Sequence, residues 1–143
     1  MQLDRKLILA ASIFVLAMLS ATFLVANAQE SQERMAHANG EGTLKIGDEQ
    51  FKISSAIVKL LPDHTAEITL VADITIFLTA KWSNHPDSQQ EFDLDVTGGA
   101  TRGGLDGAGK VSFSEDGKSI KRLTLKGVSR TSKRAVQADF EGK

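Results

Sequence analysis

The alternation of apolar and polar residues is clearest between Thr65 and Ser83, where every even-numbered residue is apolar and most odd-numbered ones are polar. A period of two predicts a half-buried β-strand, because successive side chains point to opposite faces. The run has 19 residues. At about 3.3 Å per residue it would extend over roughly 60 Å, which is too long for one strand of a small domain. It must therefore turn back on itself or bend sharply.

The break in this run is expected around Val71-Ala72-Asp73. A three-residue connection keeps the parity of the apolar positions across a hairpin, whereas a two-residue connection reverses it, and here the parity is kept. The segment lacks the glycine or asparagine that favours a tight turn. A single, strongly bent strand is therefore the alternative interpretation.

A three-residue hairpin loop is predicted just before the run, at Pro62-Asp63-His64. Proline followed by aspartate suits a type I turn, and histidine tolerates the left-handed third position that glycine usually takes. Pairing Leu61 with Thr65 places the apolar residues of both strands on one face. The expected opposite pairs are Leu60 with Ala66, Val58 with Ile68 and Ala56 with Leu70.

An earlier hairpin is predicted around Asp48-Glu49, with Ile46 opposite Phe51 on the same face. The strand that follows moves its apolar residues from odd to even positions. Such a change within one strand is typical of a β-bulge, which we expect near Ser54-Ser55.

The C-terminal half predicts four more strands. Gly98–Gly109 contains six glycines and predicts a flexible loop, and Asp116-Gly117 is a strong two-residue hairpin signal. In the last hairpin, Ser129 opposite Arg134 brings Leu123 to Phe140, Leu125 to Ala138 and Gly127 to Val136. The predicted strands are Glu91–Thr97, Lys110–Ser114, Ile120–Ser129 and Ala135–Glu141.

The fold class that follows is all-β, an antiparallel meander of seven to eight strands with no helix after residue 42. Because nearly every connection can be a simple hairpin, we expect a small up-and-down barrel, with a two-sheet β-sandwich as the alternative.

The N-terminal part predicts export. Residues 1–28 have a charged start, a long apolar run and an Ala-Asn-Ala ending. This is the pattern of a cleaved signal peptide, which we expect to be helical. The apolar residues 7–25 could instead serve as an uncleaved membrane anchor. Residues 29–42 are polar and predict a flexible linker, followed by a single β domain at 43–143. The expected location is periplasmic or secreted, or membrane-anchored if residues 7–25 are retained.

Composition limits the possible partners. The chain has a net charge of −1, and removing Asp4, Arg5 and Lys6 with the signal leaves −2. This mild charge gives no reason to expect nucleic acid as a partner. The absence of cysteine excludes disulfides and a thiol nucleophile, so stability must come from packing and sheet hydrogen bonds.

No pattern predicts catalysis, a cofactor or a metal. The glycine-rich segment leads into a strand rather than into Lys-Ser/Thr and a helix, unlike a phosphate-binding loop. His85-Pro86-Asp87 offers too few converging ligands for a metal site. The carboxylates Glu91, Asp93 and Asp95 lie on the outward face of a strand, where a solvated ladder is the simplest interpretation. We therefore predict a non-enzymatic protein.

Two functions remain as hypotheses. In the first, the barrel holds a small apolar ligand in its interior, and the single tryptophan, Trp82, is a possible ligand platform. A cavity of several hundred Å³ would support this hypothesis, and a filled core would remove it. In the second, the protein is an envelope or extracellular interaction module that docks to an anionic component through its C-terminal hairpin. The basic residues proposed for that patch are Arg122, Lys126, Arg130, Lys133 and Arg134.

Overall fold

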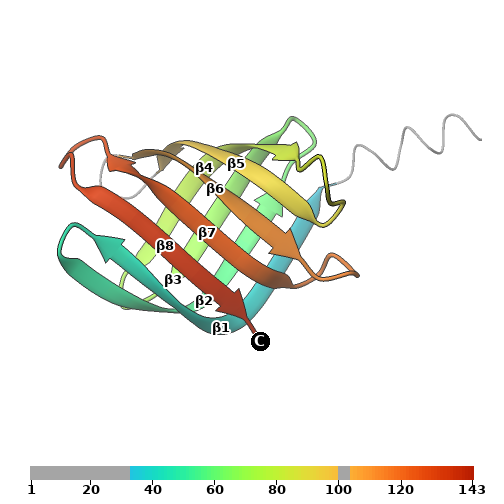
Figure 1. Cartoon of the computed structure of the whole chain (residues 1–143), viewed down its shortest axis with the longest axis horizontal. Helices are drawn as coiled ribbons and strands as arrows, with labels where there is room; N and C mark the ends of the chain where they lie inside the picture. Colours follow the sequence, from blue (N-terminus) through green and yellow to red (C-terminus); the bar gives the residue numbers. More distant parts are fainter. Residues whose placement is uncertain (1–32, 100–103) are drawn as a thin grey trace, which may run out of the picture. The chain divides into compact units, whose positions relative to one another are not determined.

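Eight antiparallel strands follow one another along the chain and close into a barrel in the order β1 to β8. They are seen in a computed structural model that describes residues 33–99 and 104–143. Figure 1 shows the strands crossing the barrel wall obliquely, with β1 and β8 side by side. The strands are β1 (Arg34–Ile46), β2 (Glu49–Leu60), β3 (Thr65–Val71), β4 (Thr75–Asn84), β5 (Glu91–Gly99), β6 (Leu105–Phe113), β7 (Ile120–Ser129) and β8 (Ala135–Gly142).

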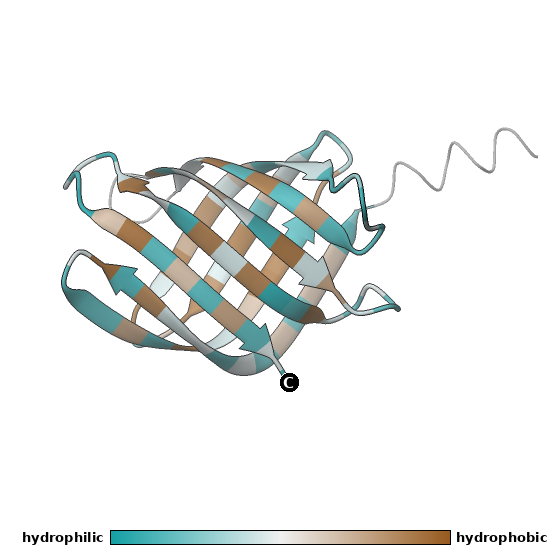
Figure 2. Cartoon of the chain, in the orientation of Figure 1, coloured by the Kyte–Doolittle hydropathy of each residue, from teal (hydrophilic) through white to brown (hydrophobic). Residues whose placement is uncertain are grey.

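Apolar and polar residues alternate along the strands because one face of each strand lines the interior (Figure 2). In β5, Phe92, Leu94 and Val96 are buried, as predicted. No polar or charged residue is buried among those the structure describes. The core is therefore wholly apolar, and ladder hydrogen bonds satisfy the backbone around it.

The barrel prediction is confirmed, and the sandwich alternative is excluded by the closed strand order. The long alternating run divides into β3 and β4, with Val71 opposite Thr75 across a three-residue connection, so the single bent strand is excluded too. The Pro62-Asp63-His64 loop has the predicted register, with Leu60 opposite Ala66. His64 has a φ of 66° in this loop.

The closing hairpin β7–β8 also has the predicted pairing, with Leu125 opposite Ala138. Closure of the barrel itself is a separate contact between strands far apart in the sequence. β8 pairs with β1, where Leu44 lies opposite Ala138 and Gly40 opposite Gly142.

The linker prediction for residues 29–42 is wrong over residues 34–42, which form the first part of β1. Ala36 and Ala38 are buried inward residues, but they are too small to give a clear apolar signal. Gly40 and Gly42 permit close approach to β8, because a Cβ on either would lie 2.0 Å or 2.4 Å from a backbone oxygen of that strand.

The predicted register of the first hairpin, β1–β2, is wrong by two residues. Ile46 pairs with Glu49 rather than with Phe51, because the turn consists of Gly47 and Asp48. Gly47 has a φ of 59°, which suits the first central position of a two-residue turn. The buried residues of β2 do move from odd to even positions, as the sequence predicts. The extra residue of the β-bulge, however, lies in β1, between Asn39 and Gly42, rather than near Ser54-Ser55.

The predicted glycine-rich loop is also largely strand. Gly98 and Gly99 end β5, and residues 105–109 begin β6. Gly107 lies opposite Gly127 in β7, and a Cβ on Gly107 would lie 2.2 Å from a backbone oxygen of β7. These glycines allow the wall to bend tightly, as at a barrel corner. The Asp116-Gly117 turn is longer than predicted, since β6 and β7 are joined by residues 114–119.

Residues 1–32 and 100–103 lie outside the described residues, and so does the predicted signal or anchor. Within the part that is described, there is no helix long and apolar enough to cross a membrane.

Candidate functional site

The two ends of the barrel differ, and we name them for their contents. The aromatic end carries the β2–β3, β4–β5 and β6–β7 connections together with the start of β1. The cavity end carries the β1–β2, β3–β4 and β7–β8 connections. The β7–β8 loop and the β1–β2 turn lie together at the left of Figure 1.

A cavity of about 340 Å³ opens at the cavity end. Its walls come from inward residues of six strands, and most of them are aliphatic. Hydroxyl side chains and one arginine of the β7–β8 connection lie at its mouth. The lining residues are Leu44, Ile46, Leu70, Ile74, Ile76, Leu78, Gly104, Leu105, Leu125, Ser129, Thr131, Ser132, Arg134, Val136 and Ala138.

The cavity forms here because of side-chain size. Among the residues that the structure describes, no aromatic one lines it. At the aromatic end, by contrast, Phe92 and Phe113 pack with their ring centres 5.3 Å apart, and both are buried. Large rings fill the width of a small barrel, whereas shorter aliphatic chains from opposite walls leave space between them.

The mouth of the cavity is shaped by the β7–β8 loop. The Ser129 amide donates to the Arg134 carbonyl at 2.9 Å, and the Lys133 amide donates to the Ser129 carbonyl at 3.0 Å. Lys133 adopts a φ of 58°. The Arg134 amide donates a long hydrogen bond of 3.4 Å to the Ser132 hydroxyl. These contacts hold the hydroxyl-bearing residues of the loop beside the apolar opening.

Arg134 is the only charged residue among the described residues that line the cavity. Its guanidinium lies 3.6 Å from the Glu49 carboxylate, and both side chains are about half exposed, at 42% and 55%. The guanidinium also covers Gly47, where a Cβ would come within 2.5 Å of Nε. The turn glycine therefore leaves room for a cation at the rim of the cavity.

Trp82, the proposed ligand platform, lies at the other end of the barrel. Its indole N–H donates to the Leu61 carbonyl at 2.9 Å. Its ring packs against His64, with centres 4.7 Å apart, and edge-on to Phe92, with centres 5.7 Å apart. Trp82 does not line the 340 Å³ cavity, and its contacts are those of a rim residue that closes the aromatic end.

The five residues of the proposed basic patch do not form one surface of free cations. Arg130, Lys133 and Arg134 are in or beside the β7–β8 loop, whereas Arg122 and Lys126 lie along the outer face of β7. Among the described residues, Lys126 and Lys133 are the two of the five with no carboxylate within 4.0 Å.

The three arginines of the set are paired. Arg122 lies 3.1 Å from Asp139, and Arg130 lies 2.6 Å from Asp106. Arg130 also donates to the Thr97 carbonyl of β5. Hydrogen bonding to Arg130 lowers the pKa of Asp106 below its usual 3.8, and the same bond raises the pKa of Arg130. Arg130 thus connects the loop to β5 and β6.

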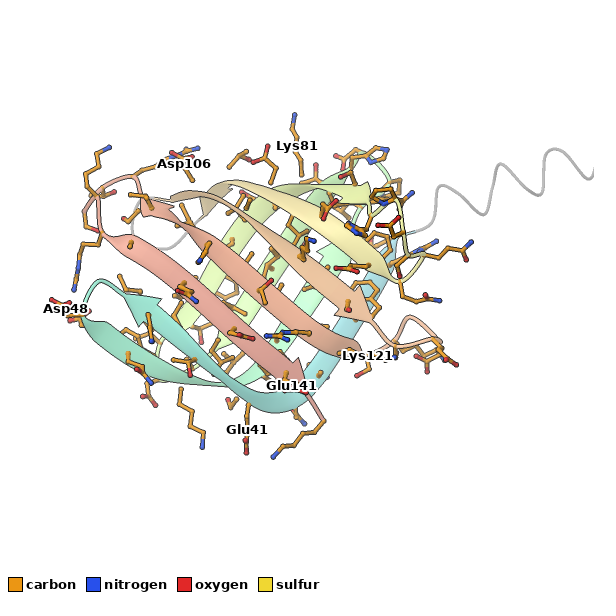
Figure 3. The ribbon with its side chains drawn as sticks, viewed as in Figure 1. Glu41, Asp48, Lys81, Asp106, Lys121 and Glu141 are labelled. Atoms are coloured by element: carbon orange, nitrogen blue, oxygen red, sulfur yellow. The ribbon has the colours of Figure 1, made fainter. Side chains whose placement is uncertain are left out.

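The outer wall carries charges of both signs. The acidic ladder on β5 is separated from β7 by one strand, β6, in which Lys110 lies opposite Asp93 and Ala108 opposite Asp95. Lys126 lies on the far side of Ala108. Figure 3 shows Lys81 and Glu41 pointing away from the wall, with Asp106 and Asp48 towards the cavity end. Opposite charges in neighbouring rows reduce the field that a distant anionic partner would meet.

His85 is the histidine with the closest carboxylate neighbours. Its Nδ1 lies 3.3 Å from Asp93, and its Nε2 lies 3.8 Å from Asp87. Nevertheless, no group of three or more potential metal ligands is found within residues 33–99 and 104–143. The contact joins the β4–β5 loop to β5.

No family model, curated protein or solved structure matches this chain. The cavity and its mouth are the features of the molecule that bear on function. Sequence reasoning identified Arg134 but not the hydroxyls of Ser129, Thr131 and Ser132, because serine and threonine are ordinary loop residues. The available signal was the set of aliphatic inward residues beside the β3–β4 turn, Leu70, Ile74 and Ile76.

Proposed function

We propose that this protein is a non-enzymatic binding protein that holds a small apolar ligand in the cavity end of its barrel. The observation that supports this most directly is the cavity of about 340 Å³ with aliphatic walls and a polar mouth. Ligand sites typically enclose about 300–1,000 Å³, with apolar walls and a few polar groups that orient the ligand. This cavity lies at the lower end of that range.

The ligand must be small. With about 30 Å³ per water-sized group, the cavity accommodates on the order of ten non-hydrogen atoms. Transferring eight methylenes from water contributes about 6 kcal/mol, at about 0.8 kcal/mol each. Losses of translational freedom oppose this gain, so we expect affinities no tighter than roughly tens of micromolar.

The interaction-module alternative receives less support. Two of its five cations, Arg122 and Arg130, have close carboxylate partners, and the remaining three lie on different parts of the surface. Solvent-exposed ion pairs of this kind also leave little net field beyond about 10 Å at physiological salt.

The proposed place of action is outside the cytoplasm, from the charged and apolar pattern of residues 1–28. N-terminal sequencing of protein recovered from the cell envelope or medium tests this. A mature chain beginning at Gln29 would support export with cleavage, and an uncleaved chain in the membrane fraction would support the anchor.

Decanol is a suitable neutral probe, since it has about as many heavy atoms as the cavity accommodates. We expect isothermal titration to detect binding with a negative heat-capacity change, the mark of apolar burial. Absence of binding by both decanol and decanoate would contradict the proposal.

Ala138→Leu tests where the probe binds. Ala138 is buried between Leu125 and Leu44 and lines the cavity, so the larger side chain occupies the ligand's space. Ala108→Leu is the matched control, because it adds the same three carbons on the exposed face of β6. Decanol binding should be lost only in Ala138→Leu. If Ala138→Leu does not fold, Val136→Phe at the same cavity replaces it. Equal binding by the filled variant and the control would place the probe elsewhere.

A further inference from the structure

We infer that the ligand is a single-chain amphiphile whose anionic head group is bound by Arg134 at the mouth of the cavity. This inference rests on the proposed function and deepens it. The cavity walls accept an apolar chain, and the mouth offers one cation together with the hydroxyl residue that ends β7 and two in the loop that follows it.

Arg134 is available for an anion because its present contact is loose. The 3.6 Å separation from the Glu49 carboxylate is longer than the 2.7–2.9 Å of a charge-assisted hydrogen bond. The planar guanidinium suits two oxygens of one carboxylate or phosphate, and a bound head group can replace Glu49 without breaking a close pair. Arg130, by comparison, is held by Asp106 at 2.6 Å.

The surroundings of Arg134 favour an anion over other head groups. No carboxylate side chain lines the cavity among the described residues, and Glu49, 3.6 Å from Arg134, lies outside this lining. A cationic head inside the mouth would therefore be repelled by Arg134. Ser129, Thr131 and Ser132 also line the cavity, and a hydroxyl can donate to an anionic oxygen. The apolar chain then extends between the aliphatic walls, where no charged group is buried in the part of the chain that the structure describes.

The test compares ten-carbon probes that differ only in the head group. Decanoate should bind the full-length mature protein about tenfold more tightly than decanol, and decylammonium more weakly than decanol. In Arg134→Gln the preference for decanoate over decanol should disappear, with decanoate losing about tenfold in affinity. Arg122→Gln is the matched control, because it removes an ion-paired arginine from the outer wall, away from the cavity.

Two further binding measurements test the role of Glu49 and the chemistry of the head group. Glu49→Gln removes the carboxylate that competes for Arg134 and should raise decanoate affinity about two- to threefold. Decyl phosphate separates the two sources of an anionic head. Tighter binding than decanoate indicates a phosphate-headed lipid, and weaker binding indicates a free carboxylic acid.

Failure of this inference can be told apart from failure of the proposed function. Equal binding of decanol and decanoate, unaffected by Arg134→Gln but lost in Ala138→Leu, would overturn the anionic head while the cavity remains the ligand site. Absence of binding by every probe would overturn both.

Discussion

The aromatic end and the cavity end of the barrel are made from strands with the same alternating pattern, yet aromatic rings pack the interior at one end and aliphatic side chains leave a cavity at the other. The hollow of about 660 Å³ at the aromatic end is lined mainly by the polar β4–β5 and β6–β7 loops rather than by inward strand residues. At the aromatic end, Phe92 contacts both Trp82 and Phe113, and the Arg34 guanidinium lies 5.9 Å from the centre of the Phe92 ring. At the cavity end the side chains that form the cavity walls are mostly those of Leu, Ile, Val and Ala. Alternation therefore decides which residues face inward, and the size of those residues decides whether space remains for a ligand.

The loops at the two ends also differ in the range of the side-chain contacts that stabilise them. In two loops of the aromatic end, aspartates accept hydrogen bonds from nearby amides: Asp63 from Thr65 at 2.9 Å and Asp116 from Lys118 at 3.0 Å. At the cavity end, Arg130 reaches from the β7–β8 loop to β5 and β6. The first kind of contact is local in sequence, whereas the second joins distant strands.

The largest expected effect is on stability, and it compares how closely side chains are packed at the two ends of the barrel. Phe92→Ala should lower the free energy of unfolding by about 3–5 kcal/mol, because it empties a closely packed site. Leu78→Ala should cost only about 2 kcal/mol, since Leu78 borders existing space. Urea unfolding curves measure both. Equal losses would mean that the two ends are packed alike. Asp93→Ala, on the outer face, removes the contact with His85 and should cost no more than about 1 kcal/mol.

A smaller loss is expected for Trp82→Phe, which keeps a ring but removes the indole N–H that donates to Leu61. The cost should be about 1–2 kcal/mol, because the Leu61 carbonyl is left without that donor. In the unmodified protein, the fluorescence of Trp82 should not change when decanol fills the cavity end. A large change on saturation would instead support Trp82 as the ligand platform.

The loop at His64 allows a finer comparison. His64→Gly should change stability by less than about 0.5 kcal/mol, because relief of the left-handed strain offsets the loss of ring packing on Trp82. His64→Ala loses the same packing without that relief and should be less stable than His64→Gly by about 1 kcal/mol. Thermal denaturation of the two variants side by side measures the difference. Equal stabilities would show that backbone strain at this position is negligible.

The smallest expected effect is a loss of folding stability at low pH. Hydrogen bonds from Thr65 and from Ser114 lower the pKa of Asp63 and Asp116, respectively, below their usual 3.8. A carboxyl whose pKa is lower in the folded state stabilises it fully above its unfolded pKa. That contribution disappears as the pH falls through the folded pKa. Urea midpoints should therefore decline below about pH 4. In the Asp63→Asn/Asp116→Asn variant the decline should be shallower, and an unchanged slope would contradict this assignment.

Much of the strand pairing could be predicted from the sequence because it depends on neighbouring residues. The Pro62-Asp63-His64 loop and the parity of the strands beside it determine the β2–β3 register. The same holds for β7–β8, where Leu125 lies opposite Ala138. In these hairpins a shift of one residue would turn an apolar set towards solvent, so the register is strongly specified.

The sequence-based prediction was wrong at glycines that lie where neighbouring strands of the barrel come close together. Gly40 and Gly107 look like loop residues in the sequence, but each lies in a strand where a neighbouring backbone comes too close for a side chain. That closeness depends on the curvature of the closed sheet and on partners such as Gly142. A local pattern of residues contains no information about it.

The sequence by itself determined the all-β class, the inward and outward faces and the order of hairpins, because each depends on alternation and turn chemistry over a few residues. Only the tertiary structure decided that β1 pairs with β8, that Trp82 closes one end, and that Arg134 stands at the mouth of a cavity at the other. Those outcomes depend on how side chains from opposite walls meet in three dimensions. Space is left where the sum of their sizes is too small to fill the barrel.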